Sequence, residues 1–368
     1  MTCNNTLRHV LFLIPSLRGG GAERVIVTLV RHLDRSRFKV ILAVIDMREA
    51  AYRQDIPNDI ELIDLNCARV RYAMPKIVRL IWRRRPDVVF STLGHLNLAL
   101  AMIRPILPGG VRYIARETTI VSEGLKRYSH PHWWVWAYRK FYNRFDKIIC
   151  QSHYMRDDLL CHFNQSVEKA VVIHNPIDIE RIHPLMMEPL ETELTGKEAV
   201  NLVAVGRLSH EKGFDLLIEA LALCANTKFR LTILGEGPLR SELEQMARDK
   251  GVMQQVHFAG FQKNPYPFIA QADAFVMSSR YEGFPNVVLE ALACCTPVVA
   301  LPAPGGVREI LNEVAGCVLA KALTPQALAL ALQEITPGSR LSEGGVRPYS
   351  IERIVNRYAV ELTCDADI

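Results

Sequence analysis

Two glutamates frame the start of an apolar segment in the second half of the chain. Glu282 and Glu290 are separated by Gly283, Phe284, Pro285, Asn286, Val287 and two further apolar residues. Because proline favours the first turn of a helix, a helix is predicted to begin near Pro285, where unpaired N–H groups suit a phosphate. A phosphate would repel both carboxylates, so they are predicted to bind sugar or ribose hydroxyls. Taken alone, the segment also fits an ordinary helix cap.

Two further glycine-containing segments follow predicted strands. Gly206-Arg207 and the nearby Lys212 come after residues 200–205, and Gly235-Glu236-Gly237-Pro238 comes after residues 230–234. Loops at the carboxyl ends of parallel strands share one edge of a sheet, so these segments and the Glu282 segment are expected to meet one ligand. Arg207 and Lys212 would supply permanent positive charge to a diphosphate leaving group. Their alternative role is that of solvated surface charges.

Strands and helices alternate along both halves of the chain, which predicts an α/β fold with two doubly wound parallel sheets. Residues 1–180 are predicted to form one domain and residues 200–345 another, joined by a linker at 181–199 that is rich in Pro, Glu and Thr. The helix-like last segment, 346–368, is predicted to return to the first domain. The predicted elements are strands at 9–15, 39–46, 60–65, 87–91, 112–115, 146–150, 170–173, 200–205, 230–234, 256–258, 274–277 and 298–301, and helices at 25–33, 76–84, 214–224 and 239–250.

Composition limits the class of protein. The 368 residues are 49% hydrophobic, which is enough for two large cores. The net charge of +5 comes from local basic stretches, and this distribution favours an anionic surface over nucleic acid as a partner. Nine cysteines without a Cys-x-x-Cys pair favour a reducing compartment. The sequence predicts neither a signal peptide nor a membrane-spanning helix, so we expect a cytoplasmic protein, either soluble or peripheral on the inner face of the cytoplasmic membrane.

The ordered set of motifs resembles one large enzyme family. It consists of His174-Asn175-Pro176-Ile177-Asp178, Val205-Gly206-Arg207 with Lys212-Gly213, Gly235-Glu236-Gly237-Pro238-Leu239, and Glu282-Gly283-Phe284-Pro285-Asn286 through Glu290. This set is similar to that of the retaining GT-B glycosyltransferases in the bacterial group 1 family, in particular its amino-sugar branch. The resemblance implies two Rossmann-like domains that face a central cleft.

The resemblance also implies roles for single residues. Glu290 matches the residue that binds the ribose, Glu282 the one that contacts the transferred sugar, and Arg207 with Lys212 the pair that holds the diphosphate. The amides of Phe284, Asn286 and Val287 would then lie near phosphate or sugar. Gly20 and Gly21 match a glycine loop that approaches the donor phosphates from the first domain. The same loop, with Asp46, also fits a dinucleotide fingerprint, but Arg24 occupies the third glycine position and weakens that alternative.

The acceptor side departs from the family pattern. Many relatives present a histidine from a strand-end loop, whereas this chain has Arg116 and Glu117 at one such loop and His95 at another. Arg116 and Glu117 are predicted to contact acceptor or donor, and His95 is either a site residue or a packed loop histidine. No metal site is predicted, because the lone Asp-x-Asp lies in the terminal tail at 365–367. Cys295 occupies a position where relatives usually have glycine, so a positive φ there would be strained.

An aromatic and basic stretch, residues 129–145, leaves two interpretations open. Its aromatic side chains either pack under the sheet or lie on an anionic membrane surface near a lipid-linked acceptor. We therefore expect a metal-independent, retaining hexosyl- or N-acetylhexosaminyltransferase that needs no cofactor. It would use a nucleotide sugar, preferably a UDP-sugar, and a polyprenyl-diphosphate-linked glycan of the O-antigen or capsule type. A sugar-nucleotide epimerase and a non-catalytic nucleotide-sugar binding protein are the alternatives.

Overall fold

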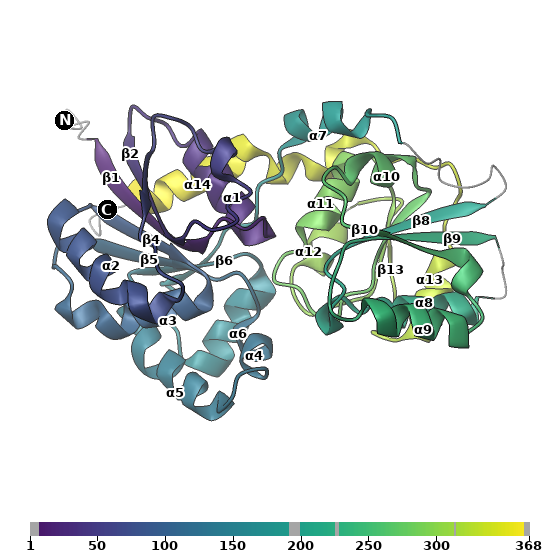
Figure 1. Ribbon diagram of the computed structural model, residues 1–368, viewed down its shortest axis with the longest axis horizontal. Helices are drawn as coiled ribbons and strands as arrows, with labels where there is room; N and C mark the ends of the chain where they lie inside the picture. Colours follow the sequence, from purple (N-terminus) through teal and green to yellow (C-terminus); the bar gives the residue numbers. More distant parts are fainter. Residues whose placement is uncertain (1–6, 191–198, 225–227, 313, 364–368) are drawn as a thin grey trace. The chain divides into compact units, whose positions relative to one another are not determined.

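The computed structural model describes residues 7–190, 199–224, 228–312 and 314–363. The chain forms two compact units, one made of residues 1–176 and 351–368 and the other of residues 177–350. The predicted Asp-x-Asp tail at 365–367 lies outside the described residues, as do positions 191–198 of the predicted linker. Within each unit the α/β alternation predicted from the sequence is confirmed (Figure 1).

Unit 1 is built on a seven-stranded parallel sheet with the order β3-β2-β1-β4-β5-β6-β7. The apolar runs predicted as strands all lie in it, with bounds that differ by one or two residues. Its strands are β1 (Arg8–Ser16), β2 (Phe38–Asp46), β3 (Glu61–Asp64), β4 (Val88–Thr92), β5 (Arg112–Arg116), β6 (Lys147–Cys150) and β7 (Ala170–Val172).

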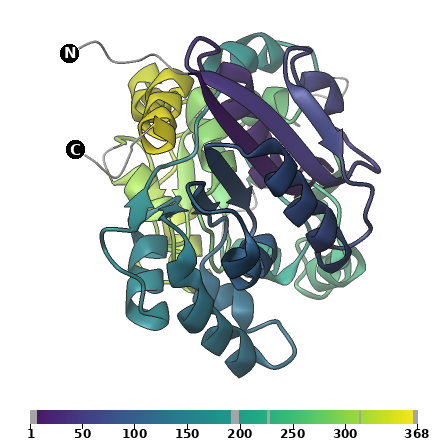
Figure 2. The same ribbon diagram turned by 90° about the vertical axis from the view of Figure 1, so that its left-hand side faces the viewer.

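Helices cover both faces of this sheet, as Figures 1 and 2 show. Helices α1 and α14 pack against each other, while α3 packs against both α2 and α5. Helix α2 begins six residues before the predicted start at Lys76, because Pro75 is accommodated inside the helix instead of starting it. The helices of unit 1 are α1 (Gly21–His32), α2 (Val70–Arg84), α3 (Gly94–Ile103), α4 (Val121–Leu125), α5 (Pro131–Phe141), α6 (His153–Phe163) and α14 (Ile351–Thr363).

Unit 2 has a six-stranded parallel sheet with the order β10-β9-β8-β11-β12-β13. The bounds of its strands are β8 (Val200–Val205), β9 (Phe229–Leu234), β10 (Val256–Gly260), β11 (Ala274–Met277), β12 (Val298–Ala300) and β13 (Val318–Leu319). The helices are α7 (Ile179–Met186), α8 (Phe214–Leu223), α9 (Arg240–Asp249), α10 (Tyr266–Gln271), α11 (Asn286–Ala293), α12 (Val307–Leu311) and α13 (Pro325–Leu332).

The boundary between the units differs from the predicted linker. Chain contacts divide the units after Pro176, and α7 lies where the sequence predicted an irregular connection. Helix α7 forms because Asp178 caps it by accepting the Arg181 N–H and because buried Ile182 packs with α10 and α11 of unit 2. Its Pro184 and short length hid this helix from the sequence pattern.

Cys295 has a φ of +55°, the left-handed conformation that the comparison with glycine suggested. A side chain in this region costs about 1 kcal/mol. We therefore expect Cys295→Gly to raise the free energy of unfolding by up to about 1 kcal/mol in urea denaturation. Cys295→Ala is the control, since alanine keeps the Cβ and the strain. Equal stability changes in the two variants would contradict this explanation.

Candidate active site

The strand order of unit 2 reverses between β8 and β11, where open α/β sheets bind ligands. The loop after β8, residues 206–213, and the loop after β11, residues 278–285, are therefore neighbours. Ser278 Oγ donates to the Lys212 carbonyl at 3.0 Å, and the Arg280 N–H donates to the Glu211 carbonyl at 2.8 Å. These bonds bring two of the segments that the sequence singled out to one place.

Lys212 and Glu282 form an ion pair at the centre of this place. Lys212 Nζ lies 2.5 Å from Glu282 Oε1, which also accepts the Ser279 hydroxyl at 2.9 Å. The side chains are only 23% and 16% exposed. Burial alone would lower the pKa of Lys212, but the attraction and the hydrogen bond of Glu282 outweigh it and raise the pKa. The ammonium therefore stays charged over the physiological pH range, next to the carboxylate.

Glycines allow the loops to approach this closely. A Cβ on Gly235, whose φ is +139°, would lie 2.0 Å from the Gly206 carbonyl oxygen, and a Cβ on Gly237 would lie 2.3 Å from that of Leu208. The Leu208 N–H donates to the Glu236 carbonyl at 2.9 Å. The Gly235 segment therefore joins the loop after β8 through backbone contacts that no other residue type would permit.

The Glu282 segment leads into α11 as predicted, with Pro285 at the N-cap. Gly283, Phe284 and Pro285 are buried, whereas Asn286 and Val287 of the first turn are partly exposed. Glu290 lies one turn further into the helix and is only 3% exposed. Arg207 is exposed at the turn after β8. Unit 2 thus places two carboxylates, two cations and a helix start on one edge of its sheet.

Two supports of this edge were missed in the sequence. Gly305 has a φ of +119°, and a Cβ there would lie 1.5 Å from the Glu282 carbonyl oxygen. The backbone at 305 therefore packs directly against the backbone of Glu282. Arg280 fixes the other side, with Nη2 2.5 Å from Asp215 Oδ2 of α8. The Gly305-Gly306 pair was the available signal for the first support. No spacing rule links Asp215 to Arg280.

In unit 1 the strand order reverses between β1 and β4. The glycine loop, residues 19–21, follows β1 and lies exposed at the start of α1. Asp46 of the dinucleotide alternative is already engaged, because Arg48 and Arg18 donate to its carboxylate at 2.8 and 2.9 Å. The hydrogen bonds from Arg48, and after them the charges of Arg48 and Arg18, lower the pKa of Asp46 against the opposing effect of burial. A carboxylate saturated by two guanidinium groups is a poor acceptor for a ribose, which argues against that alternative.

The turn between β4 and α3 lies across the same switch point. Leu93 has the rare combination of φ +75° and ψ 124°, and His95 stands exposed in the first turn of α3. Burial nevertheless lowers the pKa of His95, so its two predicted roles, site residue and packed loop residue, both stay predictions. Its place at the switch point keeps it a candidate on the acceptor side.

Arg116 and Glu117 lie at the carboxyl end of β5 but are almost completely buried, at 0% and 1% exposure. Arg116 donates to Asn175 Oδ1 at 2.7 Å, to Tyr358 Oη at 3.0 Å and to Thr92 Oγ1 at 3.4 Å. In this structure the guanidinium meets protein oxygens on three sides. The predicted direct contact with substrate would require it to leave them.

Glu117 accepts hydrogen bonds from Asn97 Nδ2 at 3.2 Å and from the Tyr142 hydroxyl, both on its Oε1. Burial is the largest influence and raises its pKa to about 7, with Asp158 adding to the rise and Asn97, Arg116 and the Thr118 N–H opposing it. Glu117 is therefore a carboxyl group that changes charge near neutral pH inside the protein.

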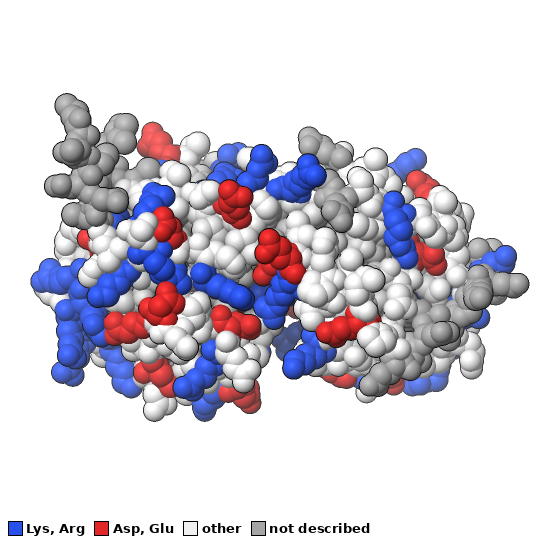
Figure 3. Space-filling model, turned by 90° about the horizontal axis from the view of Figure 1, so that it is seen from above, with Lys and Arg blue, Asp and Glu red and all other residues white. Residues whose placement is uncertain are grey.

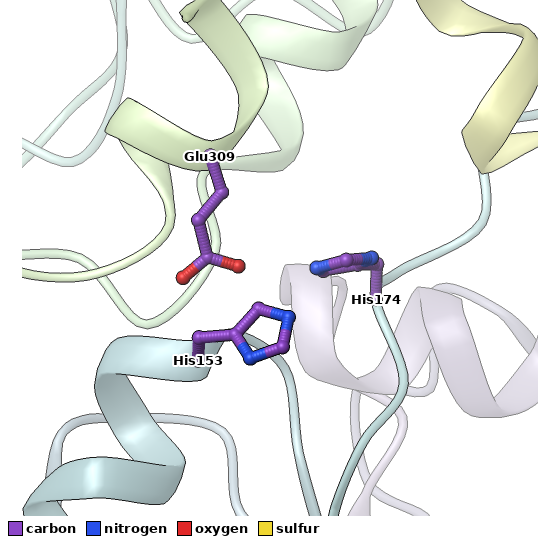
Figure 4. Close-up of side chains that lie close together, drawn as sticks. All are labelled: His153, His174 and Glu309. Atoms are coloured by element: carbon purple, nitrogen blue, oxygen red, sulfur yellow. The ribbon is translucent and has the colours of Figure 1, made fainter.

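Two histidines that the sequence analysis did not assign lie at neighbouring strand ends of unit 1. His153 begins α6 after β6, and His174 follows β7, with ring centroids 6.2 Å apart and an edge-to-face arrangement (Figure 4). The residue after His174 is Asn175, which binds Arg116 and Gln151. The His174-Asn175-Pro176 motif is thus anchored through its asparagine.

Comparison with known proteins agrees with this geometry. Residues 191–343 match the family described as glycosyl transferases group 1, and residues 19–181 match glycosyltransferase family 4. The protein is a glycosyltransferase of the GT-B fold.

The glycosyltransferase has relatives in bacteria and archaea. It is 29% identical over 316 residues to N-acetylgalactosamine-N,N'-diacetylbacillosaminyl-diphospho-undecaprenol 4-alpha-N-acetylgalactosaminyltransferase of Campylobacter jejuni, with 82% of each chain covered. It is 30% identical over 247 residues to an uncharacterized glycosyltransferase, MJ1059, of Methanocaldococcus jannaschii, which covers 64% of this chain and 60% of that protein. Other relatives include the lipopolysaccharide core biosynthesis glycosyltransferase LpsE of Rhizobium meliloti, 34% identical over 47% of this chain and 49% of that protein.

Solved structures share the fold over nearly the whole chain. The crystal structure of Anabaena Alr3699/HepE in complex with UDP covers 96% of this chain and 99% of its own, with a TM-score of 0.76 and 21% identity. A glycosyltransferase from Rickettsia africae covers 98% and 100%, with a TM-score of 0.78 and 15% identity. The names of several relatives of this chain place those proteins in lipopolysaccharide core or amylovoran biosynthesis.

Proposed function

We propose that this glycosyltransferase moves a hexose or N-acetylhexosamine from a UDP-sugar onto a lipid-linked oligosaccharide, with retention of the anomeric configuration. The observation that carries the proposal is the Lys212–Glu282 pair, held beside the start of α11 by the glycine-crowded loops of unit 2. In the proposed complex, Lys212 and Arg207 bind the diphosphate, Glu282 the transferred sugar and Glu290 the ribose. The amides at the start of α11 face a phosphate.

The proposed chemistry needs no group beyond these residues and the substrate. Negative charge grows on the diphosphate as the glycosidic bond breaks, and Lys212 and Arg207 stabilise that charge. The acceptor hydroxyl attacks from the face that the diphosphate leaves, and a diphosphate oxygen takes the hydroxyl proton. Glu282 is free to bind sugar hydroxyls because Lys212 and Ser279 contact only its Oε1 among the bonds described.

The donor and the acceptor are supported by names among the similar proteins. The Campylobacter relative acts on a diphospho-undecaprenol-linked glycan and transfers N-acetylgalactosamine, and the Anabaena structure contains UDP. We therefore propose a UDP-N-acetylhexosamine as the first donor to test and a polyprenyl-diphosphate-linked glycan as the acceptor.

A panel of nucleotide sugars tests the proposal in two steps. First, the donor is expected to raise the melting temperature, because it binds only the folded protein. Second, UDP release is expected to depend on a diphospho-undecaprenol-linked glycan, and NMR of the product is expected to show the anomer of the donor. Conversion of the donor without an acceptor would instead indicate an epimerase, and binding without any release would indicate a binding protein.

We further propose that unit 1 binds an anionic membrane surface through the faces of α2 and α5. Residues 69–85 include seven Arg and Lys and no acidic residue. Tyr72 and Trp82 are exposed there, and Trp133 and Trp136 are 46% and 47% exposed on α5. Figure 3, which views the molecule from above, shows Lys and Arg side chains together with several Asp and Glu on the unit 1 part of the surface, at the left. Exposed aromatic rings among basic residues suit an anionic lipid interface.

Each of the two interpretations of residues 129–145 fits a different subset of their side chains. Tyr138, Tyr142 and Phe145 are buried, and the Tyr138 ring centroid lies 5.4 Å from that of Phe163 in α6, whereas Trp133 and Trp136 remain at the surface. Among the residues described, no helix is long and apolar enough to cross a membrane. Any attachment through these residues would lie at the interface.

Replacing Trp133 and Trp136 together by serine is expected to weaken binding to vesicles of anionic phospholipid by at least about tenfold, because apolar area leaves the interface. Vesicle co-sedimentation at low and high salt measures the effect. Phe261→Ser, at a 75% exposed aromatic residue of unit 2, is the matched control. Unchanged vesicle binding in the double variant, with intact folding, would contradict the membrane proposal.

A further inference from the structure

We propose that Arg116 and Glu117 are positioning residues that hold the turn between β4 and α3, and with it His95, from two sides. This inference rests on the proposed function, in which His95 lies on the acceptor side. In this proposal Arg116 and Glu117 do not contact the substrate themselves. They act by holding the turn in place.

Glu117 holds the turn on the α3 side. Its carboxylate accepts from Asn97 Nδ2, and Asn97 Oδ1 in turn accepts the Ser91 hydroxyl at 2.8 Å, so the residues before and after the turn are joined. A Cβ on Gly94 would lie 3.3 Å from Glu117 Oε2 and 2.4 Å from the Tyr138 hydroxyl. The turn therefore packs against the carboxylate at a glycine, next to His95.

Arg116 holds the turn on the other face of the sheet, since successive side chains of a strand point in opposite directions. Its guanidinium binds Thr92, the last residue of β4, and Tyr358 of α14. The same guanidinium binds Asn175, the neighbour of His174. One buried side chain thus ties the turn that carries His95 to the segment that carries His174.

The backbone of the turn gives an independent reason for such support. Leu93 combines φ +75° with ψ 124°, which a branched side chain adopts only where the surroundings impose it. Every group that holds the turn is buried, including Ser91, Thr92, Asn97, Arg116 and Glu117. A strained turn clamped by buried polar groups is the arrangement that fixes a side chain in one position.

Matched pairs of substitutions test the proposal. Glu117→Met removes the acceptor at similar length, whereas Glu117→Gln keeps it. Likewise Thr92→Val removes the hydroxyl that Thr92→Ser keeps. Hydrogen exchange of the amides of residues 93–97 is expected to become about tenfold faster in the Met and Val variants, as for one lost buried hydrogen bond. It should stay close to that of the unchanged protein in the Gln and Ser variants.

Activity and donor binding separate positioning from simple stability. The Met and Val variants are expected to lose about tenfold in kcat while their Kd for UDP stays within about twofold, because the donor residues lie in unit 2. Ile114→Val, a buried change on β5 itself, is the control that loses stability without touching the turn. Met and Val variants with normal exchange, or with no greater loss of kcat than Ile114→Val, would overturn the inference. The hydrogen-exchange measurement needs no substrate, so it tests the inference even if the screen finds no donor.

Discussion

Lys212→Ala is expected to lower the rate of sugar transfer by a factor of about 10²–10³ while unit 2 stays folded. Lys212 Nζ is the cation nearest to Glu282 in the described contacts, and its side chain is largely withdrawn from water. Charge on a departing diphosphate is stabilised most by a fixed cation in such a poorly solvated place. Alanine removes that cation, and it also leaves the Glu282 carboxylate to repel the diphosphate.

The measurement is UDP release with the donor and acceptor identified in the screen, together with circular dichroism to follow the fold. Arg207→Ala is expected to act in the same direction. Because Arg207 is exposed and makes no side-chain contact among the bonds described, its loss should not affect folding. Lys250→Ala is the control, since Lys250 is an exposed lysine of the same unit that pairs with Glu219 at 3.4 Å. Near-normal transfer in both Lys212→Ala and Arg207→Ala would refute the assignment.

Glu117 is expected to make the stability of the protein fall as pH rises from about 4.5 to about 7. Burial raises the pKa of Glu117 to about 7, so the folded protein keeps a proton that the unfolded chain loses near its ordinary value of 4.5. Between these values the folded state binds more protons than the unfolded state, and the free energy of unfolding therefore decreases with pH. A difference of this size corresponds to roughly 3 kcal/mol.

Glu117→Gln isolates this contribution. The amide keeps an oxygen for Asn97 and Tyr142 but cannot ionise, so the variant is expected to gain stability relative to the unchanged protein as pH rises from 5 to 8. The gain should approach roughly 3 kcal/mol and should level off above pH 7. Urea denaturation at several pH values gives the difference, and Glu352→Gln, an exposed site of the same unit, is the control. A difference independent of pH would contradict the buried ionisation.

The fold was largely predictable because its signals are local. Apolar runs such as 10–14 and 274–277 can only be buried, and turn residues between them set the alternation from which parallel sheets follow. The prediction failed where tertiary packing outweighs local pattern. Helix α7 is stabilised by contacts of Ile182 with α10 and α11, and α2 tolerates Pro75 inside it.

The candidate site was predictable in unit 2 for a related reason. Glycines and charged residues just after apolar strands must gather at one sheet edge, and the sequence marks both the strands and the loops. Lys212, Glu282 and the start of α11 meet there. The sequence could not reveal which backbone segments pack against these site residues. The approach of Gly305 to Glu282 depends on strand register, which no residue type encodes alone.

In unit 1 the same reasoning placed the candidate residues at strand ends and left their roles undecided. By itself, the sequence predicted only that Arg116, Glu117 and His95 lie at the ends of strands. Only the tertiary structure decided that the first two are buried and the third is exposed, because burial depends on residues far away in the chain. Tyr358, which binds Arg116, lies 242 positions from it. The charge of a side chain is local, whereas the solvent around it is set by the whole fold.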